Sequence, residues 1–185
     1  WLATRVQSRQ RAKHNAAIAE AADGKTREVA IRLTASISSN LYEEWVENRK
    51  KLVEKYSNGR LGYIHIKGMD FPSFEVVERE FAAAGYGKEG LLIDVRYNGG
   101  GYVSSSDLLT NLMVKDLASK VDKVMNKRQY NEAYTKEVIK QYGAASLVTN
   151  FKMESNNIGS LNRVFFLTST GTASASELII NNLKP

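Results

Sequence analysis

The feature that most constrains the fold of this chain is a strand–loop–helix pattern that occurs three times. The strands are predicted at 61–68, 90–97 and 163–169, and the helices that follow them at 73–86, 104–121 and 173–184. Such an alternation is typical of an α/β fold in which right-handed crossovers join parallel strands. The runs "GLLIDV" and "RVFFL" are almost continuously apolar, so we expect both strands to be covered on both faces of the sheet.

The N-terminal part of the chain follows a different pattern. Residues 1–22 are rich in Ala, Gln and Arg and favour a helix or an irregular lead-in. A turn then precedes an alternating apolar segment, which predicts a strand within residues 23–36. Residues 40–60 predict a helix that stops at Asn58 and Gly59. Its apolar stripe consists of Leu41, Trp45, Asn48 or Arg49, and Leu52.

Residues 122–160 interrupt the strand–helix pattern as a polar insertion. "NEAYTKEVIKQYG" gives a helical signal and "ESNNIGS" a loop signal. In an α/β protein an insertion of this kind often shapes a substrate groove. A plain excursion from the fold explains the same residues equally well, so both interpretations stay open.

Composition and charge exclude several classes of protein. The chain of 185 residues contains no cysteine, which excludes disulfides, thiolate metal sites and a Cys nucleophile. No apolar run approaches the ~18–20 residues that cross a bilayer, so we expect no membrane span. The net charge is +6, and basic residues gather in residues 1–40. They alternate there with acidic and apolar residues, which favours a solvated helix face over a nucleic-acid-binding surface.

Three consecutive glycines follow the second strand in "DVRYNGGG", residues 94–101. A glycine loop can turn sharply and direct backbone N–H groups toward a phosphate or an oxyanion. The spacing matches neither the G-x-G-x-x-G nucleotide motif nor a P-loop. A flexible connection explains the loop as well as a ligand site does. The carboxyl edge of a parallel sheet is nevertheless where α/β proteins bind ligands.

The stretch "TASASE", residues 172–177, occupies the corresponding place after the third strand. Ser174 and Glu177 fit a capping box, in which the Ser174 hydroxyl accepts a hydrogen bond from the first turn of the helix. The same position suits a nucleophile, because the positive end of the helix dipole stabilises a developing anion. Spacing alone favours the helix cap and leaves the nucleophile open.

Few other residues offer chemistry. His65 lies within the first strand and His14 in the basic lead-in, and we expect structural or exposed roles for both. Without cysteine or clustered histidines a metal site lacks suitable ligands, so we expect no metal and no cofactor. Asp94 ends a strand and is expected to hold the glycine loop or Arg96, with a general-base role as the alternative.

Taken in order, "LLIDVRYNGGG" and "VFFLTSTGTASASELIINNL" resemble the C-terminal processing (tail-specific) serine peptidases and their relative, tricorn protease. The resemblance covers about residues 57–185. It implies that Ser174 is the nucleophile and that the backbone N–H groups of Gly100 and Ala175 form an oxyanion hole. Gly99 stands where processing peptidases often carry Pro. The supporting positions of the two motifs are Asp94, Arg96, Asn98, Gly99, Gly101, Ser176 and Glu177.

The resemblance also implies a fold and a division into domains. The fold is the ClpP/crotonase-like spiral of repeated ββα units, with a parallel sheet and flanking helices. Residues 1–38 would hold the lead-in helix and the last strand of a PDZ-like domain. Residues 39–185 would form the serine peptidase core, with the insertion at about 122–160.

The general base is the main departure from the family pattern. Processing peptidases use a lysine a couple of dozen residues beyond the serine, whereas Lys184 follows Ser174 by only ten. Tricorn protease uses a histidine from the start of its peptidase domain, and neither His65 nor His14 has that context. We therefore expect the base to lie outside this chain, which is truncated before it, and the chain alone to be inactive.

The resemblance implies a serine-type endopeptidase that hydrolyses peptide bonds in protein tails or peptides. The alternatives are a non-catalytic peptide-binding or scaffold module with the same fold, and a crotonase-type acyl-CoA enzyme, which would not need the serine. The expected partner is a peptide or unfolded protein, with no nucleic acid, and a homo-oligomer is left open. The family favours the bacterial cell envelope, periplasm or secretion, with the cytoplasm as the alternative.

Overall fold

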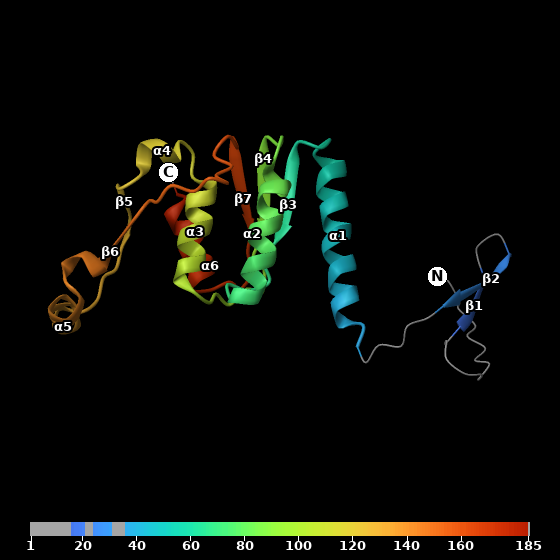
Figure 1. Cartoon of the computed structure of the whole chain (residues 1–185), viewed down its shortest axis with the longest axis horizontal. Coiled ribbons are helices and arrows are strands. Elements are labelled where there is room, and N and C mark those ends of the chain that lie inside the picture. Colours follow the sequence, from blue (N-terminus) through green and yellow to red (C-terminus); the bar gives the residue numbers. More distant parts are fainter. Residues whose placement is uncertain (1–15, 21–23, 31–35, 185) are drawn as a thin grey trace. The chain divides into compact units, whose positions relative to one another are not determined.

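The computed structural model describes residues 16–20, 24–30 and 36–184. These residues belong to two compact units, Trp1–Glu44 and Trp45–Pro185. Figure 1 labels the helices and strands of both units in chain order. Within the described residues, no helix combines the length and the apolar character needed to cross a membrane.

The first unit contains two strands, β1 (Ala16–Glu20) and β2 (Thr26–Ala30), which pair antiparallel. The helix predicted across 1–22 is therefore wrong for Ala16–Glu20, because pairing with a neighbouring strand overrides the helix preference of alanine. The predicted strand is confirmed over Thr26–Ala30. Residues 1–15, which include His14, lie outside the described residues.

The helix predicted at 40–60 is confirmed as α1 (Ser38–Tyr56). Asn58 and Gly59, at the predicted stop, have φ angles of 52° and 75°, in the left-handed region that commonly ends helices. No residue of α1 is fully buried. Its apolar stripe is only partly covered, because Leu52 remains 47% exposed.

The second unit is built on a three-stranded parallel sheet with the order β3-β4-β7. The strands are β3 (Leu61–His65), β4 (Gly90–Asp94) and β7 (Arg163–Leu167). Each was predicted as a strand, and the α/β fold with a parallel sheet and flanking helices is confirmed.

A helix follows each strand of the sheet: α2 (Phe71–Gly85), α3 (Val103–Met113) and α6 (Ala175–Asn182). Helix α2 packs on β3, and α3 packs on α6. The core between them is apolar and includes Ile64, Phe81, Leu91, Ile93, Leu109 and Ile179. In Figure 1 the strands end at the lower edge of the sheet, and the three helices begin there. This carboxyl edge brings the loops of both motifs to one side of the molecule.

Strands β4 and β7 differ in coverage although both sequences are apolar. Strand β4 is buried on both faces over most of its length, as predicted. Strand β7 alternates between exposed and half-buried residues, and Phe165 is 41% exposed. The prediction that "RVFFL" is covered on both faces is therefore wrong. Only the face with Val164 and Phe166 meets the core, and within the described residues β7 pairs with β4 alone.

The helix predicted at 104–121 is interrupted. Helix α3 ends at Met113, and a short helix α4 (Leu117–Lys120) begins after Asp116. Asp116 has a φ of 54°, and this left-handed conformation, which Asp tolerates better than most residues, breaks the helix.

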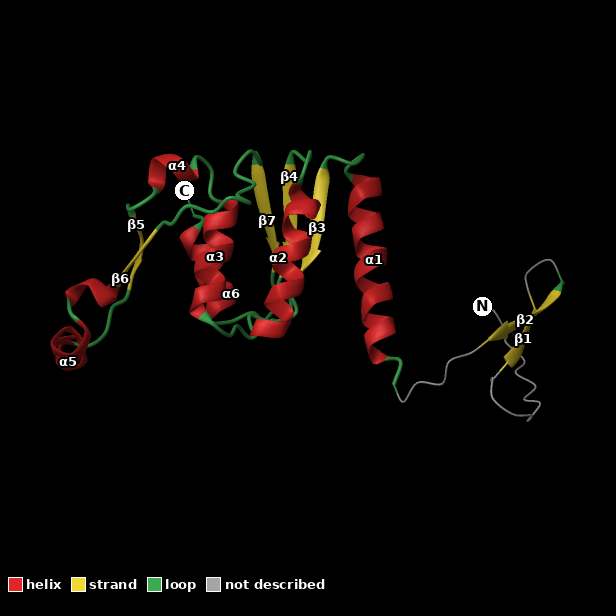
Figure 2. Cartoon of the chain, viewed as in Figure 1, coloured by secondary structure: helices red, strands yellow, loops and turns green. Residues whose placement is uncertain are grey.

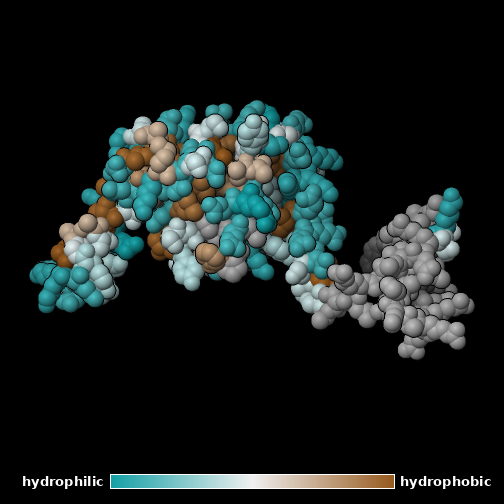
Figure 3. Space-filling view, viewed as in Figure 1, coloured by the Kyte–Doolittle hydropathy of each residue, from teal (hydrophilic) through white to brown (hydrophobic). Residues whose placement is uncertain are grey.

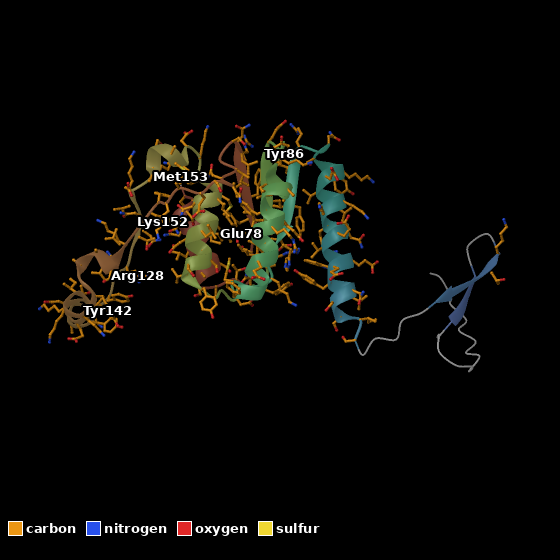
Figure 4. The ribbon with its side chains drawn as sticks, in the orientation of Figure 1. Glu78, Tyr86, Arg128, Tyr142, Lys152 and Met153 are labelled. Atoms are coloured by element: carbon orange, nitrogen blue, oxygen red, sulfur yellow. The ribbon has the colours of Figure 1, made fainter. Side chains whose placement is uncertain are left out.

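The insertion forms an antiparallel ribbon of β5 (Val124–Lys127) and β6 (Val148–Asn150). Between these strands lie α5 (Glu132–Tyr142) and the 3-10 helix η1 (Ala144–Leu147), as Figure 2 shows by colour. Helix α5 confirms the helical signal, whereas the ribbon was not predicted. No residue of α5 is buried, and its surface in Figure 3 is largely hydrophilic. The labelled side chains of Arg128 and Tyr142 mark this outer part of the insertion in Figure 4.

Candidate active site

Two loops meet at the carboxyl edge of the sheet. Residues 95–102 connect β4 to α3, and residues 168–174 connect β7 to α6. The Ala173 N–H donates to the Asn98 carbonyl oxygen at 3.1 Å. The Tyr97 N–H donates to Ser169 Oγ at 2.9 Å. The glycine motif and the serine motif, far apart in sequence, are therefore bonded to each other in the fold.

Ser174 is exposed at this edge as the N-cap residue of α6. Its backbone angles, φ 55° and ψ −121°, lie outside the regions that non-glycine residues prefer. Residues held in such conformations cluster at functional sites, where the surrounding structure imposes them. Gly100 has a φ of 98°, and a Cβ added to it would lie 2.7 Å from Ser174 Cβ. The backbone at Ser174 is thus in close contact with Gly100, where only glycine fits.

The capping box predicted between Ser174 and Glu177 is hydrogen-bonded through the Glu177 side chain, whereas within the described residues the Ser174 side chain makes no capping hydrogen bond. The Ser174 N–H donates to Glu177 Oε2 at 3.0 Å. The Glu177 N–H donates to the Ser174 carbonyl oxygen at 2.9 Å. Ser174 is therefore both the helix cap and an exposed hydroxyl at the positive end of a helix.

The two predicted oxyanion donors differ in their present state. The Ala175 N–H is the first of helix α6, so it has no acceptor within the helix. The Gly100 N–H already donates to Asn98 Oδ1 at 2.9 Å. Gly100 lies beside Ser174, and of the two N–H groups only that of Ala175 donates to no acceptor among the described residues.

Asn98 holds the glycine loop from within. Its side chain is fully buried, and its Nδ2 donates to the Ile66 carbonyl oxygen at 2.8 Å. With Oδ1 occupied by the Gly100 N–H, both ends of the amide bind backbone groups. Asn98 therefore fixes the loop and is not placed to contact a substrate.

Asp94 is fully buried at the end of β4 and accepts four hydrogen bonds. Arg96 supplies three of them: Nε to Oδ1 at 2.9 Å, Nη2 to Oδ2 at 2.6 Å, and its backbone N–H to Oδ1 at 3.1 Å. The Tyr63 hydroxyl donates to Oδ2 at 2.9 Å. This bidentate pair confirms the prediction that Asp94 holds Arg96.

The same network sets the protonation of these groups. Burial raises the pKa of the Asp94 carboxyl, but the hydrogen bonds from Arg96 and Tyr63 outweigh burial and hold the pKa below its usual value. Burial, followed by the nearby Asp94, raises the pKa of the Tyr63 phenol. Asp94 is thus a fixed anion, which argues against the alternative role as a general base.

The remaining predicted site residues differ in how closely other atoms surround them. Gly101, with a φ of 145°, would clash with Met69 if it carried a Cβ, and the Met69 N–H donates to the Gly100 carbonyl oxygen at 3.1 Å. Gly99 faces open space. Ser176 is fully buried behind Ser174, and its Oγ has no hydrogen-bond partner in the described structure.

Neither described candidate for a base lies beside Ser174. His65 packs edge-on against Trp45 with ring centroids 5.0 Å apart, and burial lowers its pKa. It lies on β3, two strand spacings from β7, or about 10 Å across the sheet. Lys184 follows α6 and is separated from Ser174 by about 15 Å of helical rise.

A pocket of about 600 Å³ opens beside Ser174. It is lined by Thr168, Ser169, Thr172, Ser174, Glu177, Leu178, Ile180, Asn181 and Lys184. A larger apolar hollow of about 1000 Å³ is lined by Leu52, Leu61, Leu92 and Phe165 among others. It reaches the starts of the strands, so the smaller pocket, which Ser174 lines, is the one that belongs to the site.

Sequence reasoning missed several residues of this site. Ser169 and Thr172 bond residues 168–174 to the end of β4, and Tyr63 binds Asp94. The alternation of β3 could have indicated Tyr63, because a residue of β3 and its neighbour on β4 share a face. The hydroxyls of the loop gave no signal beyond their number.

Comparison with known proteins agrees with this geometry. A model of peptidase family S41 matches residues 60–185. The tricorn protease homolog of Saccharolobus solfataricus is 40% identical over 94 residues, which are 51% of this chain and 9% of that protein. The tricorn protease of Thermoplasma volcanium is 42% identical over 76 residues, 41% of this chain and 7% of that protein. The chain thus spans less than a tenth of the length of these curated relatives.

A solved structure of the tricorn protease has the same fold as this chain, with a TM-score of 0.58 at 20% identity, and covers 90% of this chain and 14% of its own length. The family match includes both loops of the site and most of the second unit. The resemblance of the two motifs is therefore confirmed, and the chain belongs to peptidase family S41.

Proposed function

We propose that this chain is the nucleophile-bearing part of a serine endopeptidase of the C-terminal processing and tricorn kind. Its substrates would be peptides or unstructured protein tails. The observation that carries the proposal is the placement of Ser174, exposed in a strained N-cap conformation against Gly100. A residue that only caps a helix has no need of close contact with a glycine loop that follows another strand.

The proposed reaction is acyl transfer. Ser174 Oγ attacks the carbonyl carbon of a peptide bond while a base takes the hydroxyl proton. The carbonyl oxygen becomes an oxyanion, to which the Ala175 N–H donates, and removal of such a donor typically slows reactions by ~10²–10³. The tetrahedral intermediate then expels the amine, which takes the proton from the base. Water hydrolyses the resulting ester and regenerates the serine.

Gly100 would supply the second donor only after its N–H leaves Asn98 Oδ1. This exchange needs a small rotation of one peptide unit, which the glycine at this position permits. Catalytic hydrogen bonds are often formed only when substrate is bound, so the present bond is compatible with the role.

The general base is proposed to lie outside residues 1–185, so these residues alone are expected to be inactive. His65 and Lys184 are both too far from Ser174 to accept its proton. A non-catalytic peptide-binding module is the second candidate, favoured by this lack of a base beside Ser174 within the described residues.

We further propose residues 39–185 as the peptidase core. The strand pair of the first unit is compatible with the end of a PDZ-like domain in residues 1–38. A homo-oligomer is a further proposal that rests on the family alone, and the compartment stays open between the cell envelope, secretion and the cytoplasm.

The proposal is tested with a fluorophosphonate probe on residues 1–185 and on a chain extended beyond residue 185. The extended chain should be labelled, and Ser174→Ala should abolish labelling. Ser146→Ala, in the η1 segment of the insertion, where no residue is buried, serves as the matched control and should label normally. No labelling of either chain would overturn the proposal in favour of the binding module. Turnover of a peptide by residues 1–185 alone would contradict the placement of the base.

A further inference from the structure

We propose that Thr172 is a positioning residue for Ser174. Its hydroxyl takes the place of the last hydrogen bond between β4 and β7 and so fixes the point at which the chain leaves the sheet toward the nucleophile. This inference rests on the proposed role of Ser174.

The hydrogen bonds at the end of the β4–β7 ladder carry the argument. Asp94 lies opposite Leu167, and the Val95 N–H donates to the Leu167 carbonyl oxygen at 3.0 Å. In a parallel ladder each residue bonds to the residues on either side of its partner. The Ser169 N–H would therefore be the regular donor to the Val95 carbonyl oxygen.

Thr172 Oγ1 stands between these two groups. It accepts from the Ser169 N–H at 3.0 Å and donates to the Val95 carbonyl oxygen at 2.8 Å. One hydroxyl thus binds both backbone groups of the missing ladder bond, and the Val95 carbonyl oxygen also accepts from the Asn98 N–H at 3.2 Å. Only a side chain that both accepts and donates at one atom can bind both groups. The hydroxyls of Thr and Ser meet this condition, and the side chain of Val does not.

The bonds of Thr172 continue into the path of the nucleophile. The Thr172 N–H donates to the Ser169 carbonyl oxygen at 3.0 Å and closes residues 169–172 into a turn. The next residue, Ala173, bonds to the Asn98 carbonyl oxygen, and Ser174 follows against Gly100. The position of Ser174 relative to the glycine loop therefore depends on the point at which the Thr172 hydroxyl replaces a backbone hydrogen bond between β4 and β7.

A second tie supports the same arrangement. Ser169 Oγ accepts from the Tyr97 N–H at 2.9 Å and from the Gly171 N–H at 3.3 Å. Thr170, in the middle of the same run, is exposed and takes part in none of these bonds. The run "TSTGT" thus contains bonded hydroxyls and a matched control.

The test measures the rate at which fluorophosphonate labels Ser174, in whichever chain labels when the proposed function is tested. Thr172→Val should lower the rate about 10–100-fold, since misplacing a reacting group by about 1 Å can cost 10²-fold. Thr172→Ser, which keeps the hydroxyl, should stay within about threefold of the parent, and Thr170→Val should not change the rate. Rates are compared at equal folded fraction from circular dichroism, so that lost stability alone does not lower them.

Amide hydrogen exchange provides a second readout. Faster exchange at Ser169 and Ala173 in Thr172→Val, with labelling slowed, supports the inference. Labelling of folded Thr172→Val at the parent rate overturns it. If Thr172→Val does not fold, Thr172→Ala, which removes the hydroxyl that binds the Ser169 N–H and the Val95 carbonyl oxygen, decides, with a severalfold slower rate in support and an unchanged rate against. Labelling of neither chain in the first test overturns the proposed function and this inference together.

Discussion

Asp94 and Asp107 show how differently two regions of this molecule hold a carboxylate. At the carboxyl edge, Asp94 receives the guanidinium of Arg96 at 2.6 and 2.9 Å, and its pKa is lowered. Where α3 faces the insertion, the Asp107 carboxylate receives, among the described residues, one hydrogen bond, from the Asn126 amide at 3.4 Å. Burial raises the pKa of Asp107, and Arg128 and Lys152 only partly oppose burial. The Arg96 guanidinium, at hydrogen-bond distance, thus fixes the Asp94 carboxylate firmly. The Asp107 carboxylate interacts with Arg128 and Lys152 only through their charges and is held more weakly.

This difference extends to the backbone. The loops of the site are joined by backbone and side-chain bonds and by glycines in close contact. Helix α5 of the insertion buries no residue. We therefore expect substitutions at the carboxyl edge to cost far more than equivalent ones in the insertion.

Gly100→Ala against Gly143→Ala should give the largest contrast. Both glycines have positive φ, but only Gly100 is in close contact, with the Ala173 carbonyl oxygen 2.8 Å from an added Cβ. We expect Gly100→Ala to destabilise by about 2–5 kcal/mol, from backbone strain and overpacking together. Gly143→Ala should cost about 1–2 kcal/mol, from strain alone. Urea unfolding measures both, and equal costs would contradict the comparison.

Arg96→Ala should have the next largest effect. It leaves the buried Asp94 carboxylate without its cation, and breaking a buried pair commonly costs ~3–5 kcal/mol. Because the Arg96 side chain is 34% exposed, we expect a smaller loss of about 2–4 kcal/mol in the free energy of unfolding. Arg79→Ala, which breaks a solvent-exposed pair with Glu80, is the control and should cost less than about 1 kcal/mol. A cost as small for Arg96 would show that Asp94 is not locked.

Asp94→Asn should change how the stability of the protein falls at acid pH. Asp94 has a folded pKa below 3.8, so its stabilisation is present above pH 3.8 and is lost as the pH falls through the folded pKa. Asp94→Asn should remove this part of the acid-induced loss, besides lowering stability at neutral pH. Unfolding midpoints measured between pH 2 and pH 7 report the change. An unaltered acid slope would be inconsistent with the lowered pKa.

Asp107→Asn should have the smallest effect and the opposite sign. Its folded pKa lies above 3.8, so its contribution favours the fold at low pH and is lost as the pH rises through the folded pKa. Above that window the charge costs stability. Removing it should leave the protein unchanged or stabilise it by less than about 1 kcal/mol at pH 7. The same pH series measures this, and marked destabilisation at pH 7 would show that Asp107 anchors the insertion.

The sequence was sufficient for the features that depend on periodicity and topology. Parallel strands followed by helices place the ends of β4 and β7 at one edge, and this brings Ser174 to Gly100. The prediction that β7 is buried on both faces was wrong, because an apolar run does not reveal which strand lies at the edge of a sheet. The ribbon of the insertion was missed, since β5 and β6 have only four and three residues.

The details of the site depend on side-chain direction, which a linear pattern does not contain. The occupied Gly100 N–H follows from the orientation of the Asn98 amide. The inserted Thr172 hydroxyl follows from a turn whose closure needs contacts from another strand. Both belong to tertiary structure, and neither has a signature at fixed spacing.

The uncovered face of β7 has a consequence for handling the protein. Phe165 and Leu167 are 41% and 36% exposed on a strand that has one neighbour in the described structure. Exposed apolar edge strands recruit further strands from other molecules and promote aggregation. We therefore expect the protein to self-associate as its concentration rises. Labelling rates measured on it should be extrapolated to high dilution.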